Sequence, residues 1–359
     1  MKILYVSQLE DYDSAWYRVL ALRREGHVVT TINTSDYGQS NRMLRKLEFR
    51  AAAGPEVNRL NRDLLTATES VRPDVVWADK VLWMRPDTLT TLRDLRVVTV
   101  SYMIDNFFGP RRDPGWRLYA RTIPHYDLHC TQRNRNLYQY LEIGARDALK
   151  IQTAYEPTVH FPPPMGWSDV DRDRDVSFVG TPYDERADFL TRLWRQCGFA
   201  VQVNGGLVWK RALGEEATAA IYRGNGELRN QAYREAIWRS RINLSFLTHS
   251  NQDEFTHKSF EIAACGGFLL AERSAGHSER FTEDKEAVFF SDFDECAAKI
   301  KRYLHDVEGR ERIARNGQWR AAMSGYDNDT QVRKIVERLQ PLIDDFRSQR
   351  RAAQQAVRG

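Results

Sequence analysis

The chain has 359 residues, of which 42% are hydrophobic and 28% are charged, and its 53 Lys and Arg nearly balance its 49 Asp and Glu, giving a net charge of +4. This composition is typical of a folded globular protein and argues against a disordered chain. It does not indicate a nucleic-acid-binding protein, although the slight positive charge suits an anionic ligand or an acidic lipid surface. The length predicts two domains.

The first residues, MKILYVSQ, contain an apolar run that is too short for a secretion signal. No uninterrupted run of about 18 apolar residues indicates a membrane-spanning helix. The four cysteines are widely spaced, as expected for buried thiols in a reducing compartment; they are Cys130, Cys197, Cys265 and Cys296. We therefore expect a cytoplasmic protein.

Short apolar segments rich in β-branched residues alternate with helical periodicity through residues 1–160. Such alternation predicts a parallel sheet with helices on both faces, and hence a Rossmann-like N-terminal domain. The predicted strands are Lys2–Ser7, His27–Asn33, Asp74–Ala78, Arg96–Met103, Tyr126–Thr131 and Leu149–Thr153.

The alternation stops at FPPPMGWSDVDRDRD, where three prolines, a glycine and alternating charges suit neither a strand nor a helix. We predict a linker at residues 161–174 and a second Rossmann-like domain at residues 175–325. Residues 326–359 are predicted to be helical, compatible with a helix that packs back on the N-terminal domain. The second set of predicted strands is Val176–Gly180, Ala200–Val203, Ile242–Leu247, Phe268–Ala271 and Ala287–Phe290.

Two doubly wound α/β domains joined in this way are expected to face each other across a cleft. Ligands of such sheets bind beyond the carboxyl ends of the strands, so the cleft is the expected site.

The most informative segment is DEFTHKSFEIAACGGFLLAE, residues 253–272. A helix is predicted from Lys258 to Ala264, with Thr256 or Ser259 as its cap and Gly266 at its left-handed end. The positive end of this helix suits a diphosphate, and an anionic ligand would account for a lysine in its first turn. Glu261, one turn further along, is placed to accept hydrogen bonds from both ribose hydroxyls.

DEFTHKSFEIAACGG resembles the acidic-x7-Glu motif of retaining family 4 glycosyltransferases, in the variant found in the CgeB-like spore-maturation group. Weaker similarities to this group occur in the same order from residue 1 to about residue 325. The resemblance implies the GT-B fold and transfer of a sugar, with retention, from a nucleoside diphosphate sugar such as a UDP or GDP sugar. It implies that Asp253 contacts the donor sugar and that Glu261 contacts the ribose. In this chain Asp253 stands where glutamate is usual.

The remaining donor-side candidates lie near the first strand of the second domain and at the start of the motif helix. Gly180 and Thr181 are expected to form a turn that approaches the phosphates. Arg186 or Lys258 is expected to supply positive charge to the leaving diphosphate, and Ser259 is a further donor-binding candidate.

The N-terminal domain is expected to hold the acceptor, which the resemblance leaves open as a glycan, a lipid-linked molecule or a small molecule. Asp105 follows a strand and is a candidate catalytic carboxylate alongside Asp253 and Lys258; it would be the general base, or Asp13 would, if the reaction were inverting. The further acceptor-side candidates are Asp11, Asp13, Arg18 and Lys80. A second interpretation of Lys80 is that it pairs with Asp79.

We expect no metal and no cofactor other than the nucleotide sugar as co-substrate. The acidic pairs of residues 169–175 lie in the predicted linker and are interpreted as solvated charges, and the eight histidines show no zinc-ligand spacing. Two other functions remain open: a nucleotide-sugar epimerase on the same scaffold, and a non-catalytic nucleotide-sugar-binding protein.

Residues 41–54, NRMLRKLEFRAAAG, are predicted to form a basic amphipathic helix. Its apolar side is compatible with packing on its own domain, and its basic side is compatible with peripheral contact to an anionic membrane.

Overall fold

The computed structural model describes residues 1–356 except 112 and 225, and it divides the chain into two compact units. The first unit contains Met1–Gln152 together with the chain from Asn328 onward, and the second contains Thr153–Asp327. The chain thus leaves the first unit after Gln152 and returns to it after Asp327. The boundary expected after residue 160 lies earlier, and the segment predicted as a linker belongs to the second unit.

The first unit is built on a parallel sheet with the strand order β2-β1-β3-β4-β5-β6. Each strand overlaps a predicted one: β1 (Lys2–Ser7), β2 (Val28–Asn33), β3 (Val75–Asp79), β4 (Val98–Tyr102), β5 (Leu128–Thr131) and β6 (Ala148–Lys150). Its helices are α1 (Ser14–Arg24), α2 (Arg42–Ala51), α3 (Pro55–Val71), α4 (Pro86–Asp94), α5 (Trp116–Thr122), α6 (Asn134–Glu142) and α14 (Asn328–Ala356).

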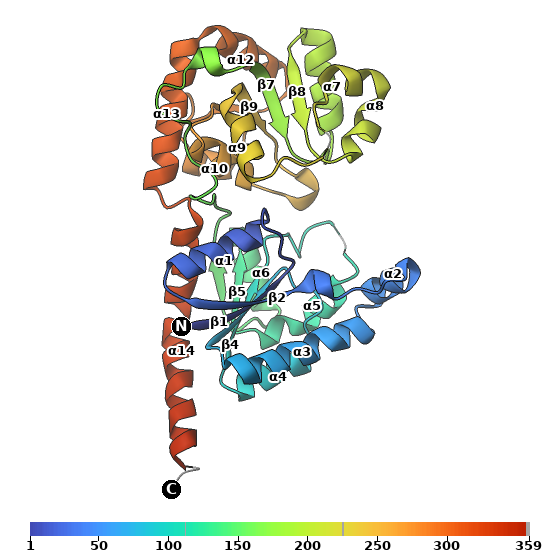
Figure 1. The fold of residues 1–359 in the computed structure, drawn as a ribbon, viewed down its shortest axis with the longest axis vertical. Helices are drawn as coiled ribbons and strands as arrows, with labels where there is room; N and C mark the ends of the chain where they lie inside the picture. The colour runs from blue at the N-terminus through green and yellow to red at the C-terminus, as the bar shows by residue number, and fades with distance from the viewer. Residues whose placement is uncertain (112, 225, 357–359) are drawn as a thin grey trace. The chain divides into compact units, whose positions relative to one another are not determined.

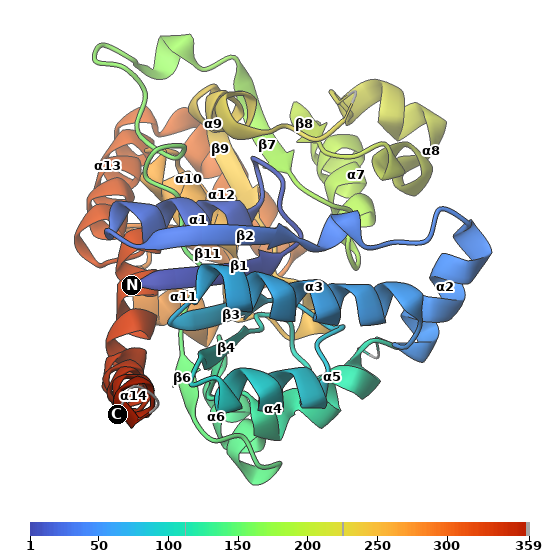
Figure 2. The same cartoon turned by 60° about the horizontal axis from the view of Figure 1, so that its bottom comes forward.

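Both faces of this sheet are covered by helices. Because successive side chains of a strand point to opposite sides, alternate residues of β1 lie in two different cores. Ile3 and Tyr5 of β1 share an apolar core with residues of α1 and α14. Leu4 and Val6 of the same strand share a second core with residues of α3 and α4. Figures 1 and 2 show α14 running beside the sheet and α3 and α4 on another side of it.

Helix α14 completes the first core although it is the last element of the chain. Its buried apolar residues recur at steps of three and four, which places them on one face of the helix; they are Val332, Ile335, Leu339, Ile343 and Phe346. Ion pairs fix its register along the unit: Arg333 with Glu25, Arg338 with Asp147, and Arg347 with Asp74, each at 2.7 Å.

An ion pair between α1 and the end of β3 is buried in the first unit. Nη2 of Arg18 lies 2.6 Å from Oδ2 of Asp79, and both side chains are at most 2% exposed. The guanidinium also stacks 4.2 Å above the ring of Tyr102, and the hydroxyl of Tyr5 donates to Asp79. Burial disfavours the charged guanidinium, but Asp79, Tyr102 and Tyr5 together outweigh burial and raise the pKa of Arg18. The sequence-based interpretation of Arg18 as an acceptor-side ligand is therefore wrong, because the residue is enclosed in the core.

We predict that Asp79→Asn destabilises the protein by about 3–5 kcal/mol, because it leaves Arg18 charged, buried and unpaired. The measurement is urea unfolding of the full chain. Glu216→Gln is the control, since Glu216 is 71% exposed and pairs with Arg195 at the surface, where such a pair contributes at most about 1 kcal/mol. Equal losses in the two variants would contradict the prediction.

The second unit is built on a five-stranded parallel sheet with the order β11-β10-β9-β7-β8. Its strands again overlap the predicted ones: β7 (Arg174–Val179), β8 (Val201–Asn204), β9 (Ser240–Ser245), β10 (Leu269–Glu272) and β11 (Val288–Phe290). Its helices are α7 (Arg186–Cys197), α8 (Val208–Ile221), α9 (Asn230–Trp238), α10 (His257–Ala264), α11 (Ala275–Arg280), α12 (Phe293–His305) and α13 (Val307–Met323). One apolar core joins the sheet to α7, α8 and α12, and another joins it to α9 and α10.

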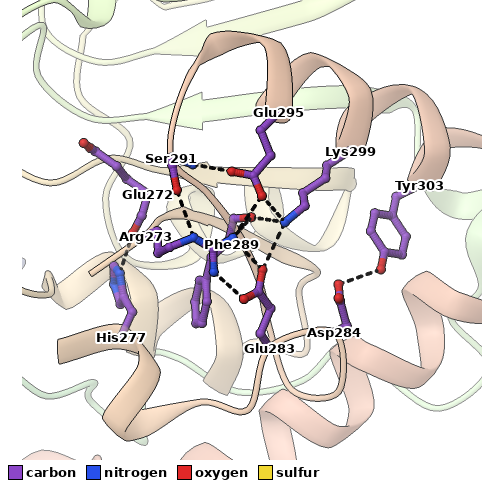
Figure 3. Close-up of polar contacts among 10 residues, drawn as sticks. All are labelled: Glu272, Arg273, His277, Glu283, Asp284, Phe289, Ser291, Glu295, Lys299 and Tyr303. Carbon is purple, nitrogen blue, oxygen red and sulfur yellow. Dashed lines mark hydrogen bonds and ion pairs between the residues drawn. The ribbon is translucent and has the colours of Figure 1, made fainter. Parts of the chain in front are cut away.

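A four-residue ion network ties α12 to the carboxyl end of β10 (Figure 3). Arg273 and Lys299 each pair with both Glu283 and Glu295. Hydrogen bonds from Lys299 act together with these charges to lower the pKa of Glu295 to about 2. The network thus links the loop after β10 to α12 by ion pairs, in addition to apolar contacts.

Three of the four aspartates at residues 169–175 form ion pairs within the second unit, although Asp173 remains 53% exposed to solvent. Asp169 lies 2.5 Å from Arg310, and Asp173 and Asp175 pair with Arg239 and Arg241. These contacts explain why a proline- and charge-rich segment is fixed to the unit that follows it.

Within the residues that the structure describes, no helix is long and apolar enough to cross a membrane. The four cysteines are free thiols, three of them buried.

Candidate functional site

The carboxyl ends of β7 and β9 form the candidate site of the second unit. These strands are neighbours in the sheet, and the chain leaves β7 toward β8 on one side and reaches β10 from β9 on the other. Such a reversal of strand order is where ligands of doubly wound sheets bind. Gly180 directly follows β7, and the loop of residues 246–256 leads from β9 into α10.

Gly180 and Lys258 are brought into contact at this edge. A Cβ atom on Gly180 would lie 2.8 Å from Cε of Lys258, so a larger residue at this position would displace the end of the lysine side chain. Trp209 fixes the same turn, because its Nε1 donates to the carbonyl oxygen of Gly180 at 2.6 Å. The spacing of these residues along the chain gives no hint of this arrangement.

Lys258 is the second residue of α10 and is partly buried. Its ammonium lies 5.3 Å from the ring centroid of Tyr233, and no carboxylate of the described residues lies within 4 Å of it. Burial lowers the pKa of Lys258; Glu261 opposes this shift and Arg186 adds to it. The site therefore holds a positive charge that is not in direct ion-pair contact with a carboxylate, a property that suits an anionic ligand.

Glu261 lies one helical turn beyond Lys258, and its Oε2 accepts a hydrogen bond from the hydroxyl of Tyr233 at 2.7 Å. Burial acts to raise its pKa. The positive potential of His160 and Lys258, with the tyrosine hydrogen bond, outweighs burial and holds the pKa of the carboxyl below its usual value. Glu261 is thus an ionised acceptor at neutral pH, with its orientation set by α9.

Tyr233 is the site residue that sequence reasoning missed. It comes from α9, contacts both Lys258 and Glu261, and packs edge-on against the ring of His160 at 5.8 Å. From sequence, a single tyrosine on an amphipathic helix is expected to be an ordinary core residue. Only the tertiary structure shows that α9 and α10 lie on the same face of the sheet, which brings Tyr233 to the site.

Asp253 lies in the loop before α10, where it accepts a hydrogen bond from Nδ2 of Asn251 at 2.7 Å. It is partly exposed. Thr181 follows Gly180 and is also partly exposed.

Arg186 is a candidate phosphate ligand from the sequence, and in the structure it contacts two loops of the second unit. Its guanidinium is buried and donates to the carbonyl oxygens of Thr181 and Leu247 at 3.1 and 2.9 Å. It also donates to the hydroxyl of Thr248 at 3.0 Å. Burial lowers the pKa of this arginine. Arg186 therefore ties the loop after β7 to the loop after β9, its Nε remains without a hydrogen-bond partner among the described residues, and the expected donor contact stays a prediction.

Ser259 is likewise an interior residue rather than a donor ligand. Its side chain is fully buried, and its Oγ lies 2.7 Å from Nε2 of His277. Nδ1 of His277 lies 2.7 Å from the carbonyl oxygen of Glu272, which only accepts, so Nδ1 carries the proton and Nε2 accepts from Ser259 (Figure 3 shows the Glu272 contact). Burial lowers the pKa of His277 to about 4, which keeps the ring neutral.

The ends of α10 are only partly as predicted. Thr256 is the N-cap residue, but its side chain makes no capping hydrogen bond. Gly266 has φ +66° and ends the helix in the left-handed conformation, as predicted. The first N–H groups of α10 thus have no side-chain cap, which leaves them available at the sheet edge that carries Lys258.

In the first unit, Lys80 and Asp105 meet at the carboxyl ends of β3 and β4. Nζ of Lys80 lies 3.6 Å from Oδ2 of Asp105, and both side chains are partly exposed. The alternative pairing of Lys80 with Asp79 is wrong, because Asp79 is committed to Arg18. The structure places Asp11 and Asp13 in the loop between β1 and α1, with Asp13 as the N-cap residue of α1.

A hollow of about 810 Å³ also lies in the first unit, beside the loop that follows β4. Aromatic and basic side chains line it, including Phe107, Trp116, Arg117 and Arg50. Among the described residues, no group of three or more His, Cys, Asp or Glu side chains is arranged to hold a metal ion.

Residues 186–337 match the model of a family described as "Glycosyl transferase-like", a stretch shorter than half of the chain that includes α10 and its site residues. The comparison with curated proteins gave no match.

Solved structures give a likeness over nearly the whole chain. The Anabaena protein HepE in complex with UDP-glucose has a TM-score of 0.67 and 15% identity, over 95% of this chain and 100% of that one. A glycosyltransferase from Rickettsia africae has a TM-score of 0.68 and 11% identity, over 95% and 98%. A UDP-N-acetylglucosamine 2-epimerase has a TM-score of 0.55 and 13% identity, over 94% and 95%. The chain has the GT-B fold.

The GT-B assignment confirms the predicted fold class of two Rossmann-like, doubly wound domains. The narrower resemblance, to retaining family 4 enzymes and the CgeB-like group, stays a prediction.

For this GT-B chain we predict that Ser259→Ala lowers the free energy of unfolding by about 1–3 kcal/mol, because Nε2 of His277 loses its donor in the interior. The measurement is urea unfolding of the full chain. Thr256→Ala, at a cap position without a side-chain cap, is the control for stability. An unchanged free energy of unfolding for Ser259→Ala would contradict the prediction.

Proposed function

We propose that the protein is a glycosyltransferase that moves a sugar from a nucleoside diphosphate sugar to an acceptor held by the first unit. The donor binds at the carboxyl ends of β7 and β9. UDP is the nucleotide that the likeness to HepE favours, since that protein was solved with UDP-glucose. The match of residues 186–337 to a glycosyl transferase-like family supports the reaction class.

The observation that carries this proposal is that one helix presents a cation without a direct ion pair and, one turn away, an ionised carboxylate. Lys258 lies against the glycine turn after β7, and Glu261 lies one turn deeper, oriented by Tyr233. A nucleoside diphosphate offers an anionic diphosphate and two ribose hydroxyls at a comparable spacing. Lysine suits the former and carboxylate oxygens suit the latter.

In the proposed reaction the bond between the anomeric carbon and the diphosphate oxygen breaks as the acceptor oxygen bonds to the same carbon. Lys258 and the uncapped N–H groups of α10 stabilise the negative charge that develops on the leaving diphosphate, which is the main electrostatic contribution to catalysis. The proton of the acceptor hydroxyl passes to the leaving phosphate oxygen on the same face, so the configuration is retained. Asp253 contacts hydroxyls of the donor sugar.

On the acceptor side, Asp105 is held by Lys80 at the strand ends of the first unit and is proposed to accept a hydrogen bond from the acceptor hydroxyl. The pairing orients the carboxylate. If the product proved inverted, Asp105 would be the general base.

A nucleotide-sugar epimerase is the second candidate, because a 2-epimerase shares the fold at a TM-score of 0.55. An epimerase changes the donor sugar without an acceptor, whereas a transferase needs an acceptor to consume it at speed. Incubation of UDP-N-acetylglucosamine and UDP-glucose with the protein alone, followed by chromatography of the sugar nucleotides, separates the two.

We predict that sugar transfer needs no divalent metal, because Lys258 and the end of α10 supply the positive charge at the diphosphate. Activity should persist in EDTA within about twofold, a difference of about 0.4 kcal/mol in the barrier. Loss of turnover in EDTA that magnesium or manganese restores would contradict this.

We predict that Glu261→Ala weakens UDP binding by about 10- to 100-fold, because a charge-assisted hydrogen bond contributes about 1.5–3 kcal/mol. Glu261→Gln should lose less, since the amide keeps one acceptor oxygen. Asp253→Ala should weaken binding of UDP-glucose but leave UDP almost unaffected. Titration calorimetry with both nucleotides measures these differences.

The control for these variants is Glu279→Ala, which removes an exposed carboxylate of α11 in the same unit. If Glu261→Ala and Asp253→Ala both bind UDP and UDP-glucose as the parent does, the donor site lies elsewhere and the proposal fails.

A further inference from the structure

Helix α2 carries an apolar surface that the first unit does not cover. Met43, Leu44 and Leu47 are 72%, 51% and 57% exposed. Figures 1 and 2 show the helix at the periphery of its unit, beyond the end of α3. The sequence is compatible with packing of this apolar face on its own domain, but in the structure Met43, Leu44 and Leu47 remain exposed. Exposed apolar residues gathered in this way mark an interaction surface.

The opposite side of α2 is basic. At about 100° per residue, the three apolar residues fall within one stripe of the helix, and Arg42, Arg45 and Lys46 fall on the other side. Arg50 lies at the border between the two. None of these four cations forms an ion pair within 4 Å with a carboxylate of the described residues. The helix therefore adds a net positive field to its apolar stripe.

Local contacts hold α2 in this exposed position. Glu48 is its one buried side chain, and it accepts from the backbone N–H groups of Glu56 and Val57 at 2.6 and 3.1 Å, at the start of α3. The side chain of Asn41 caps the helix by accepting from the N–H groups of Met43 and Leu44. The carboxylate that would neutralise the basic side is thus turned inward, and the apolar stripe is turned outward.

We propose that α2 binds the surface of an anionic lipid membrane, with Met43, Leu44 and Leu47 in the boundary between headgroups and acyl chains and the four cations on lipid phosphates. Charge complementarity selects this occupant. A second copy of the chain would bring four further cations against the first four, which is repulsive. A neutral lipid surface would leave the cations without partners. The inference does not depend on the proposed reaction.

The test is flotation of the full-length protein with phosphatidylcholine vesicles, with and without about one-third phosphatidylglycerol. The parent protein should bind only the anionic vesicles, and more weakly at high salt because the charges are then screened. Arg42→Gln/Arg45→Gln/Lys46→Gln should lower the partition coefficient by about 100-fold, since each cation near such a surface contributes about fivefold. Leu44→Ser/Leu47→Ser should lower it by about tenfold or more.

Two matched controls lie on other helices. Lys301→Gln/Arg312→Gln/Arg315→Gln removes three exposed charges from α12 and α13, and Trp319→Ser/Met323→Ser removes apolar side chains that are 62% and 67% exposed. Both should bind vesicles as the parent does, and circular dichroism checks that all variants are folded. Equal binding to neutral vesicles, no binding to anionic ones, or equal losses in the controls would overturn the proposal. So would self-association through α2, detected by ultracentrifugation, without vesicle binding.

Discussion

A parallel sheet has two faces to bury and gathers the carboxyl ends of its strands at one edge, and both consequences shape this protein. In the first unit the need to cover the face that carries Ile3 and Tyr5 is met partly by α14, the last helix of the chain. In the second unit the same constraint places α9 and α10 side by side on one face. Tyr233 of α9 can then reach Glu261 of α10, which no feature of the chain order would suggest.

Burial separates the polar groups that hold the structure from those that remain available to a ligand. Arg18 and Asp79 neutralise each other in the first core, and both terminal nitrogens of Arg186 donate to loop carbonyl groups or a threonine hydroxyl of the second unit. Ser259 and His277 form a neutral hydrogen-bonded pair under α10. Lys258 and Glu261 differ, because each keeps its charge in a partly buried position without a direct ion pair. This combination of charge and partial burial, rather than residue type, makes Lys258 and Glu261 the candidate donor site.

The loops around the site depend on the groups beneath it. Gly180 leaves the space that the end of the Lys258 side chain occupies beside β7, and Trp209 holds the turn by its indole N–H. Arg186 spans the gap between the loops after β7 and β9.

The order of strands and helices was predictable from the sequence, because buried parallel strands produce short apolar runs whose signal is local. All eleven predicted strands overlap observed ones, and Gly266 ends α10 as its position indicated. The GT-B fold and the positions of Lys258 and Glu261 on one helix also followed from sequence pattern and resemblance. The unit boundaries did not, because the 161–174 segment is held by ion pairs with arginines far along the chain. The roles of Arg18, Arg186 and Ser259, and the contact of Tyr233 with Glu261, were decided only by the tertiary structure. Their partners lie 61, 61, 18 and 28 residues away, and burial of a polar side chain is set by such distant contacts rather than by its neighbours in sequence.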